Sequence, residues 1–485
     1  MALTAQIPAS TAEVTSHKRK YKAEKEARAK IQQPRLQCEY LLPHKQNRRC
    51  NMTRKVNEKF CAQHLSIDDT NDRVKCPFDH GHSVRKEELA RHLKKCNAVK
   101  RTNIENEVWF TLDANVLRAS EPEIELGEVT FEEFTEWIDY VNKAYSSIAP
   151  DSSLSAAELH PVIQLSHECL APRLVQLSNK KHAIQQSSLI AHLDSAHLLK
   201  CNNYYVEFGC GRGELSRYVN HGLMLLHSQS KDTSYKPKFL LIDRDSMRLK
   251  LDNKIITDTE DAEISTPQVN RFKTDIKDLD LVAEPRLSSL ENSDTQMVAI
   301  SKHLCGAATD LTIQCLANYS SSSRQANQIP LAGALIALCC RQRCTYSTFP
   351  ITRLPSSELV TSRGFKILTK MSSWAVCGRR RPTINKELNF TNTQKDAQEG
   401  DHQDEEDEGY EADCDGSVNH APLHASRLHI EAREEIGFKV RALLDHARIM
   451  NIRERFDGYD AKLFRYVERG VSYENMALLI VPKGN

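Results

Sequence analysis

The feature that most restricts the fold is a glycine-rich turn between an apolar run and an amphipathic stretch. The run Tyr204–Phe208 continues as Gly-Cys-Gly-Arg-Gly, so that the acid Glu207 precedes Gly209, Gly211 and Gly213. Glycine lets a backbone approach a ligand without a Cβ clash, and the start of the following helix favours negative charge. A strand, a tight turn and a helix in this order predict an α/β fold with a ligand held at the turn.

Further short apolar runs follow the turn, separated by helical windows. They lie at Phe239–Ile242, Met297–Ile300, Ala334–Leu338 and Met476–Val481. Runs of this length that alternate with helices are typical of a parallel sheet with crossover connections. The most apolar run, Leu331–Cys340, has only ten residues and is too short to cross a bilayer. We therefore expect no membrane association.

Polar residues follow these runs where the strands end. Asp243 ends the second strand, and an acid there can accept hydrogen bonds from both ribose hydroxyls of a nucleotide. Asp275 follows a third element that begins at Arg271. Lys302 and His303 follow the fourth strand, at the edge where reacting groups of open α/β sheets gather. Either side chain could receive a proton from an acceptor there.

The glycine turn also separates two classes of nucleotide-binding enzyme. A dinucleotide fingerprint needs a third glycine at the position that Glu214 occupies. The form acid-x-Gly-x-Gly-x-Gly resembles instead the first motif of Rossmann-like methyltransferases, which bind S-adenosylmethionine. This resemblance implies that the glycines pass under the methionine moiety and that Glu207 lies near the cationic end of the cofactor. It also implies that Asp275 contacts adenine.

Cysteine and histidine form two constellations near the N-terminus. They are Cys38-x11-Cys50-x10-Cys61-x2-His64, with His44 as a competing ligand, and Cys76-x5-His82-x9-His92-x3-Cys96, with His80 as a spare. Thiolate and imidazole groups in such sets satisfy tetrahedral zinc, and four protein ligands close a site to substrate. We therefore expect structural zinc at each set, which would supply folding free energy that these short polar segments lack. Unrelated surface Cys and His residues are the alternative.

A second group of cysteines follows the run Ala334–Leu338. Cys339, Cys340 and Cys344 lie there beside Arg341 and Arg343. Packed, reduced cysteines are the favoured interpretation, with metal or redox chemistry as the alternative. The arginines could hold an acceptor phosphate.

Positive charge is concentrated around the Cys/His constellations. Residues 17–101 carry 23 Lys and Arg against 10 Asp and Glu, whereas the whole chain has a formal net charge of +1. Such a basic region favours a polyanionic partner, although a merely solvated face is the alternative. The N-terminus lacks the basic start and apolar core of a secretory signal. We expect an intracellular protein, nuclear or cytoplasmic.

The chain is predicted to have five parts. They are a basic disordered arm at 1–34, a CCCH module at 35–66, a CHHC finger at 73–98, a helical linker at 104–200 and a cofactor-binding domain at 201–485. Nine acids and no Lys or Arg lie between Asp401 and Gly416. This run predicts a disordered acidic insertion at 395–417 within the last part.

The order of these motifs resembles one family, the eukaryotic tRNA ribose 2′-O-methyltransferases that act on position 4 of the acceptor stem. The blocks Lys181–Gln186, Ser301–Gly306 and Cys339-Cys340-Arg341 carry the resemblance together with the glycine turn and both Cys/His sets. It implies a Rossmann-like class I fold with a mostly parallel seven-stranded sheet, S-adenosylmethionine and two structural zinc ions. It also implies tRNA as partner and no DNA. Lys181 or His182 becomes the next candidate base if the helical segment folds over the cleft.

Two rival functions are weighed on the residues. A base- or protein-methylating enzyme would share the glycine turn but should carry a signature such as Asn-Pro-Pro-Tyr after the fourth strand, and this is absent. A non-catalytic RNA-binding adaptor with a methyltransferase-like fold would be expected to have a broken turn, and this one is intact. The sequence carries no signal for the oligomeric state.

Overall fold

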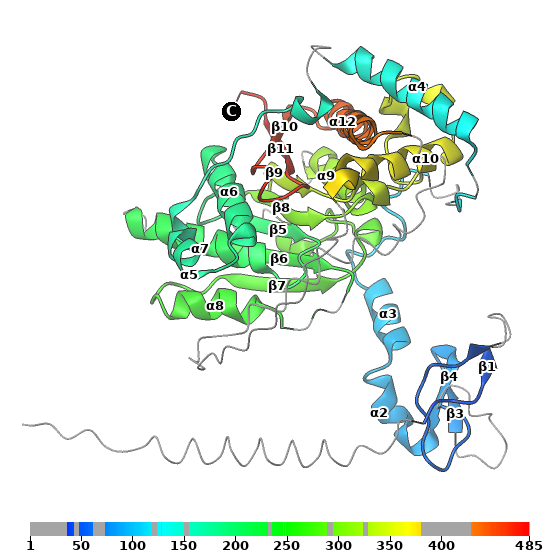
Figure 1. Ribbon diagram of the computed structural model, residues 1–485. Coiled ribbons are helices and arrows are strands. Elements are labelled where there is room, and N and C mark those ends of the chain that lie inside the picture. The colour runs from blue at the N-terminus through cyan, green and yellow to red at the C-terminus, as the bar shows by residue number, and fades with distance from the viewer. Residues whose placement is uncertain are drawn as a thin grey trace, which may run out of the picture. The chain divides into compact units, whose positions relative to one another are not determined.

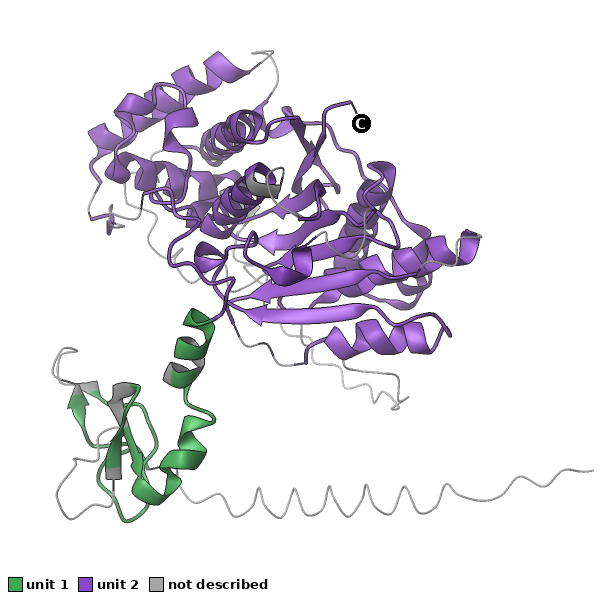
Figure 2. Cartoon of the chain, turned by 180° about the vertical axis from the view of Figure 1, so that it is seen from behind, with its two compact units in different colours: residues 1–106 green, residues 107–485 purple. Residues whose placement is uncertain are grey.

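Two compact units make up the chain, residues 1–106 and 107–485 (Figure 2). The computed structural model describes residues 36–42, 48–61, 73–118, 124–127, 129–149, 155–230, 235–245, 247, 249–288, 294–323, 328–379 and 428–484. The predicted arm at 1–34 and the predicted acidic insertion at 395–417 lie outside these residues, as do His44 and His64.

The first unit is built from short elements around cysteines. Strands β1 and β2 pair antiparallel, and so do β3 and β4. The elements are β1 (Leu41–Leu42), β2 (Arg48–Arg49), β3 (Arg73–Cys76), β4 (Asp79–Arg85), α2 (Leu89–Leu93) and α3 (Asn97–Glu105). Cys38, Cys50 and Cys61 form a buried cluster with Phe60 packed against it. A cluster this small cannot replace an apolar core, which is the situation that metal ligation resolves in small modules.

The second unit is organised by one sheet, which has seven strands among the described residues, in the order β10-β11-β9-β8-β5-β6-β7 (Figure 1). The strands are β5 (Tyr204–Phe208), β6 (Lys238–Asp243), β7 (Gln268–Lys273), β8 (Met297–Leu304), β9 (Leu331–Leu338), β10 (Tyr459–Arg465) and β11 (Met476–Pro482). Strands β7, β6, β5, β8 and β9 are parallel neighbours. Strand β11 lies antiparallel to both β9 and β10, so the sheet is mixed.

Helices cover both faces of this sheet. Figure 1 shows α5, α6 and α7 grouped on one side and α9, α10 and α12 on the other. The helices are α4 (Phe131–Ile148), α5 (Ala171–Gln176), α6 (Lys181–Ser195), α7 (Glu214–Gln229), α8 (Asp252–Glu260), α9 (Ala307–Ser323), α10 (Ser362–Ser372) and α12 (Ile430–Arg455). No described helix combines the length and the apolar character that crossing a membrane requires.

The core follows from the alternation of side chains along each strand. Tyr205 of β5 and Phe239 of β6 belong to the same buried cluster as Ile190 of α6 and Val219 of α7. A second cluster joins α4 to α10 and α12, with Phe134 of α4 among its members. Most of the region that the sequence predicted as a helical linker therefore packs into the second unit, which begins at residue 107.

Candidate active site

The predicted glycine residues form a turn at the carboxyl end of β5. Gly209, Gly211 and Gly213 have φ of 62°, 49° and 86°, which is left-handed backbone that residues with a Cβ rarely adopt. A Cβ added at Gly209 would lie 3.0 Å from Leu304 Cδ1 of β8. A Cβ added at Gly211 would meet no atom within 4 Å. The turn therefore packs against β8 on one side and is open at its centre.

Asp243 and Arg271 hold the turn in place. The Asp243 carboxylate, at the end of β6, accepts hydrogen bonds from the Gly211 N–H and the Asp245 N–H, both at 2.8 Å. Arg271 of β7 donates to the Gly211 carbonyl at 2.8 Å and forms an ion pair with Asp252 at 2.7 Å. The sequence named Asp243 as a ligand contact but gave Arg271 no role. Both side chains fix the backbone that a ligand would meet.

Glu207 lies in the sheet interior, and this differs from its expected place beside the cofactor. Strand alternation puts it on the same face as Tyr205, toward α7. Its carboxylate is 2% exposed and accepts hydrogen bonds from the Ser216 N–H at 3.1 Å and the Ser216 hydroxyl at 2.5 Å. Gly213, the residue just before α7, has no side chain to cap the helix, so the Glu207 carboxylate accepts the Ser216 N–H of its first turn instead. Burial raises the pKa of Glu207 to about 7, against these two hydrogen bonds.

Asp275 follows β7 and caps a short 3-10 helix, Ile276–Asp278, by accepting from the Lys277 N–H at 3.1 Å. Beside it, the Trp109 ring stacks on Phe272 with the ring centroids 4.6 Å apart. The Asp275 side chain is partly exposed. The predicted contact between Asp275 and adenine stays a prediction, on a strand end next to that of Asp243.

Lys302 and His182 come together from β8 and α6. The Lys302 Nζ lies 3.2 Å from the His182 Nδ1, although the residues are 120 positions apart. The rings of His182 and His303 have centroids 6.2 Å apart. His303 has φ of 63°, a strained backbone for a residue with a Cβ, at a place where the pairing of β8 with β9 shifts register. Helix α6 therefore lies beside the end of β8 at Lys302, and the role of His182 as a base stays a prediction.

The environment of His303 differs from that of its neighbours. Close packing of protein atoms lowers the pKa of His303 below its usual value, and the charges of Lys302 and His182 lower it further. The His303 side chain is exposed, and solvent weakens this lowering of its pKa. A lowered pKa makes His303 a weak base.

The other basic residues singled out in the sequence lie in different surroundings. Lys181 is exposed at the start of α6, and its role as a candidate base stays a prediction. Arg341 is 1% exposed and forms ion pairs with Asp445 at 2.6 Å and Glu474 at 2.9 Å, so it is a structural residue and cannot hold an acceptor phosphate. Sequence reasoning missed this because both acids lie more than a hundred positions away. Arg343 is exposed.

Helix α6 also carries polar residues that the sequence did not single out individually. Gln185 and Gln186 are both 0% exposed, and their amide groups have no hydrogen-bond partner among the described residues. Buried amides without partners are costly. Their signal in the sequence was a run of four polar residues, 185–188, within a helical segment close to His182.

Similarity to known proteins decides the family. Residues 184–481 match the family model described as Methyltransferase TRM13. Residues 36–65 match the CCCH zinc finger in TRM13 protein, and residues 73–97 match the U11-48K-like CHHC zinc finger. The chain belongs to the TRM13 methyltransferase family. The resemblance noted from the sequence motifs is thereby confirmed.

Curated relatives of the TRM13 family cover almost the whole chain. Proteins named "tRNA:m(4)X modification enzyme TRM13" are 39% identical in Yarrowia lipolytica, 37% in Debaryomyces hansenii and 34% in Saccharomyces cerevisiae. The matches cover 92%, 94% and 93% of this chain and 90%, 94% and 96% of the relatives. A solved structure, the plantazolicin methyltransferase BpumL in complex with SAH, matches at 11% identity over 72% of this chain and 100% of that chain. Its TM-score of 0.24 is too low for any argument.

The residues at the turn fit the cofactor that methyltransferases use. An alkyl group at Gly211 would enter open space, so the backbone there is accessible to a bound molecule. The Asp243 carboxylate lies at the same edge and can exchange a backbone partner for ribose hydroxyls. This donor set suits S-adenosylmethionine.

The two Cys/His sets fit zinc where the structure describes them. The Sγ atoms of Cys50 and Cys61 are 4.0 Å apart, and the Cys61 N–H donates to the Cys38 Sγ at 3.1 Å. In the second set, ligand atoms of Cys76, His92 and Cys96 lie within 4.8 Å of one another. His82 lies in β4, and its side chain, like all of His64, is outside the described residues. The zinc fingers predicted from spacing are confirmed as families.

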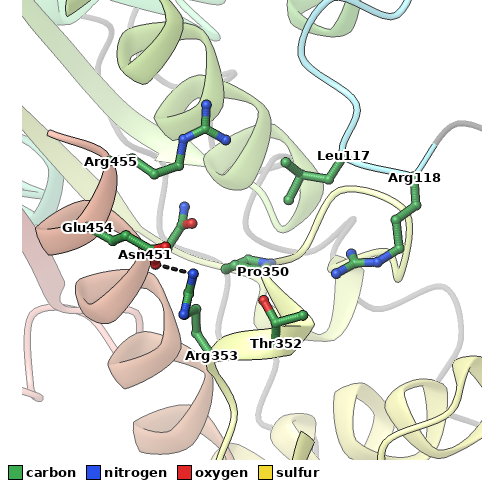
Figure 3. Close-up of a pocket in the computed structure, with 8 residues that line it drawn as sticks. All are labelled: Leu117, Arg118, Pro350, Thr352, Arg353, Asn451, Glu454 and Arg455. Carbon is green, nitrogen blue, oxygen red and sulfur yellow. Dashed lines mark ion pairs between the residues drawn. The ribbon is translucent and has the colours of Figure 1, made fainter. Parts of the chain in front are cut away.

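A separate pocket lies between the segment at 117–118, the 3-10 helix Ile351–Arg353 and the end of α12 (Figure 3). It has a volume of about 410 Å³. It is lined by Leu117, Arg118, Pro350, Thr352, Arg353, Asn451, Glu454 and Arg455. Arg118 donates to backbone carbonyls, and Arg353 pairs with Glu454. No residue of the glycine turn or of the Lys302–His182 pair lines this pocket, so it is distinct from the candidate site.

Proposed function

We propose that this chain transfers a methyl group from S-adenosylmethionine to the ribose 2′-hydroxyl of nucleotide 4 in the tRNA acceptor stem. One observation carries the proposal, namely the contact between the glycine turn and the strand end that bears Lys302. Leu304 lies against Gly209, and the Ser301 hydroxyl donates to the Phe208 carbonyl at 2.7 Å. A cofactor at the turn would therefore be next to the Lys302–His182 pair.

The cofactor would supply an activated methyl group, so the protein has two remaining tasks. It must align the ribose oxygen with the methyl carbon, and it must remove the hydroxyl proton, because a neutral hydroxyl is a poor nucleophile. Asp243 and the glycine turn would fix the cofactor. Lys302 and His182 would face the acceptor.

In the proposed reaction the oxygen–methyl bond forms as the sulfur–methyl bond breaks, and the hydroxyl proton passes to the Lys302–His182 pair and then to water. The short distance between the two nitrogens lets one proton be shared, which keeps the pair ordered. His303, as a weak base, would hydrogen-bond to the acceptor or to the pair without holding the proton.

The first unit would bind tRNA. Among the described residues, its exposed basic side chains are Arg49, Lys55, Lys59, Lys75, Arg85, Lys86, Arg91, Lys94 and Lys95. They lie on two modules with metal-ligating residues at their centres, and positive charge on a rigid module suits contact with the phosphate backbone. We assign one structural zinc ion to each module. His64 and His82 would be the fourth ligands.

The test is methyl transfer from tritium-labelled S-adenosylmethionine to an in vitro transcribed tRNA by the full chain. We expect label in one alkali-resistant dinucleotide that spans nucleotides 4 and 5. A transcript with a 2′-deoxyribose at nucleotide 4 should accept no label, whereas the same change at nucleotide 6 should leave labelling intact.

Each rival function gives a different result. Label that stays with a mononucleotide after alkaline hydrolysis would indicate base methylation and contradict the proposal. Binding of tRNA without any transfer, under conditions where the cofactor binds, would indicate a non-catalytic adaptor.

A further inference from the structure

Three cysteines converge at the edge of the sheet beside the candidate site, and the TRM13 zinc-finger matches do not include them. Cys305 follows β8, and Cys339 and Cys340 follow β9. Their sulfur atoms all lie within 4.8 Å of one another. The Sγ atoms of Cys305 and Cys339 are 3.1 Å apart.

The pairing of β8 with β9 brings these sulfurs together. Leu304 and Leu338 are partners in the parallel pairing of β8 with β9, so the next residue on each strand is a cysteine in the same register. Gly306 then lets the chain after β9 come close, since a Cβ there would lie 2.3 Å from the Arg343 backbone carbon. Its φ of 49° also requires glycine.

We propose that Cys305, Cys339 and Cys340 bind a third zinc ion, which fastens the ends of β8 and β9 beside Lys302 and His303. Sulfurs around zinc are about 3.8 Å apart for a zinc–sulfur distance of about 2.3 Å. The Cys76 and Cys96 sulfurs, in a set that matches a zinc-finger family, are 3.7 Å apart. Small side-chain rotations would bring the three sulfurs to that spacing. Three thiolates select a soft cation such as zinc.

A disulfide is the competing explanation, and it accounts for less. A disulfide joins two sulfurs at about 2.0 Å and gives the third no role. A zinc ion would bind all three sulfurs as thiolates, with a solvent water as the fourth ligand.

The experiment measures zinc per chain by mass spectrometry in the full-length protein, purified under reducing conditions. Cys339→Ser should contain one zinc ion fewer than wild type. Cys315→Ser, which changes another buried cysteine that lies in α9 outside the cluster, should contain as much zinc as wild type. Cys76→Ser should also lose one ion, and the double variant Cys76→Ser/Cys339→Ser should lose two. The losses are then independent of each other.

Equal zinc content in wild type and Cys339→Ser would overturn the proposal. Because Cys339→Ser could fail to fold, Cys340→Ser and cobalt substitution provide a second test. In cobalt-loaded protein, each of the two variants should lower the sulfur-to-cobalt absorption relative to Cys315→Ser, with an unchanged circular dichroism spectrum. Unchanged absorption, or a Cys305–Cys339 disulfide found by peptide mapping of wild type under the same reducing conditions, would contradict a zinc site.

Discussion

At the scale of single residues, the candidate site depends on groups whose neighbours give them unusual properties. Glu207 is a buried carboxyl that caps α7, and Lys302 is paired with His182 across 120 positions of sequence. Glu207 stabilises the glycine turn by capping the helix that follows it. Lys302 lies next to the reacting atoms in the proposed reaction. The two roles predict different consequences of substitution.

Replacing Glu207 by Gln should change how stability depends on pH. The folded-state pKa of about 7 lies above the ordinary 4.5, so the folded chain holds a proton that the unfolded chain has lost. Stability from this group is complete below about pH 4.5 and is lost as the pH rises toward 7, by on the order of 2–3 kcal/mol. The free energy of unfolding of Glu207→Gln, relative to wild type, should therefore rise between pH 5 and pH 8 in urea titrations. A constant difference across that range would contradict the buried carboxyl.

Replacing Lys302 by Met should lower kcat by about a hundredfold or more, because removing a general base has effects of that size. The KM for S-adenosylmethionine should change little, since the turn and Asp243 are untouched. Lys180→Met changes an exposed lysine just before α6 and should leave kcat near the wild-type value. Steady-state rates of methyl transfer at varied concentrations of S-adenosylmethionine measure kcat and KM. A Lys302→Met enzyme within threefold of wild type would exclude the lysine as base.

At the scale of elements, two glycines that follow neighbouring strands, β5 and β8, have the same φ and different surroundings. Gly211 and Gly306 both have φ of 49°. Added Cβ atoms would meet open space at Gly211 and the Arg343 backbone at Gly306. One turn is therefore shaped for a ligand, and the other for close packing of the segments after β8 and β9.

This difference predicts that alanine affects mainly stability at Gly306 and mainly ligand binding at Gly211. Gly306→Ala should lower the free energy of unfolding by ~2 kcal/mol or more, from backbone strain and overpacking. Gly211→Ala should cost only about 1 kcal/mol, from the backbone alone, but should weaken binding of S-adenosylhomocysteine. Thermal unfolding of both variants measures the loss of stability, and titration with S-adenosylhomocysteine measures the loss of binding. Equal stability losses would show that the Arg343 backbone can move aside.

At the scale of the whole molecule, the proposal assigns tRNA binding to the first unit and cofactor binding to the second. Cys76→Ser removes one ligand of the CHHC finger, so the module should lose its zinc and its ordered basic surface. The affinity for tRNA should fall about tenfold at low salt, with a smaller dependence on salt concentration. The affinity for S-adenosylhomocysteine should not change. Loss of both affinities together would contradict the division between the units.

Features encoded in short segments could be predicted from the sequence. Features that depend on contacts between distant residues could not. The strand, turn and helix around Gly209–Gly213 could be predicted because periodicity and glycine spacing are encoded within one short segment. The place of Glu207 could not, because a motif does not state which face of the strand a side chain occupies. The burial of Arg341 depends on Asp445, 104 positions away. The Cys305–Cys339–Cys340 cluster similarly depends on the register between β8 and β9.

The most direct test of the account is calorimetric titration of S-adenosylhomocysteine into the full chain. We predict saturable one-to-one binding with a Kd on the order of micromolar, weakened at least about tenfold in Asp243→Asn and in Gly211→Ala. No heat of binding in folded wild-type protein, or equal affinity in all three proteins, would contradict a cofactor site at the turn after β5.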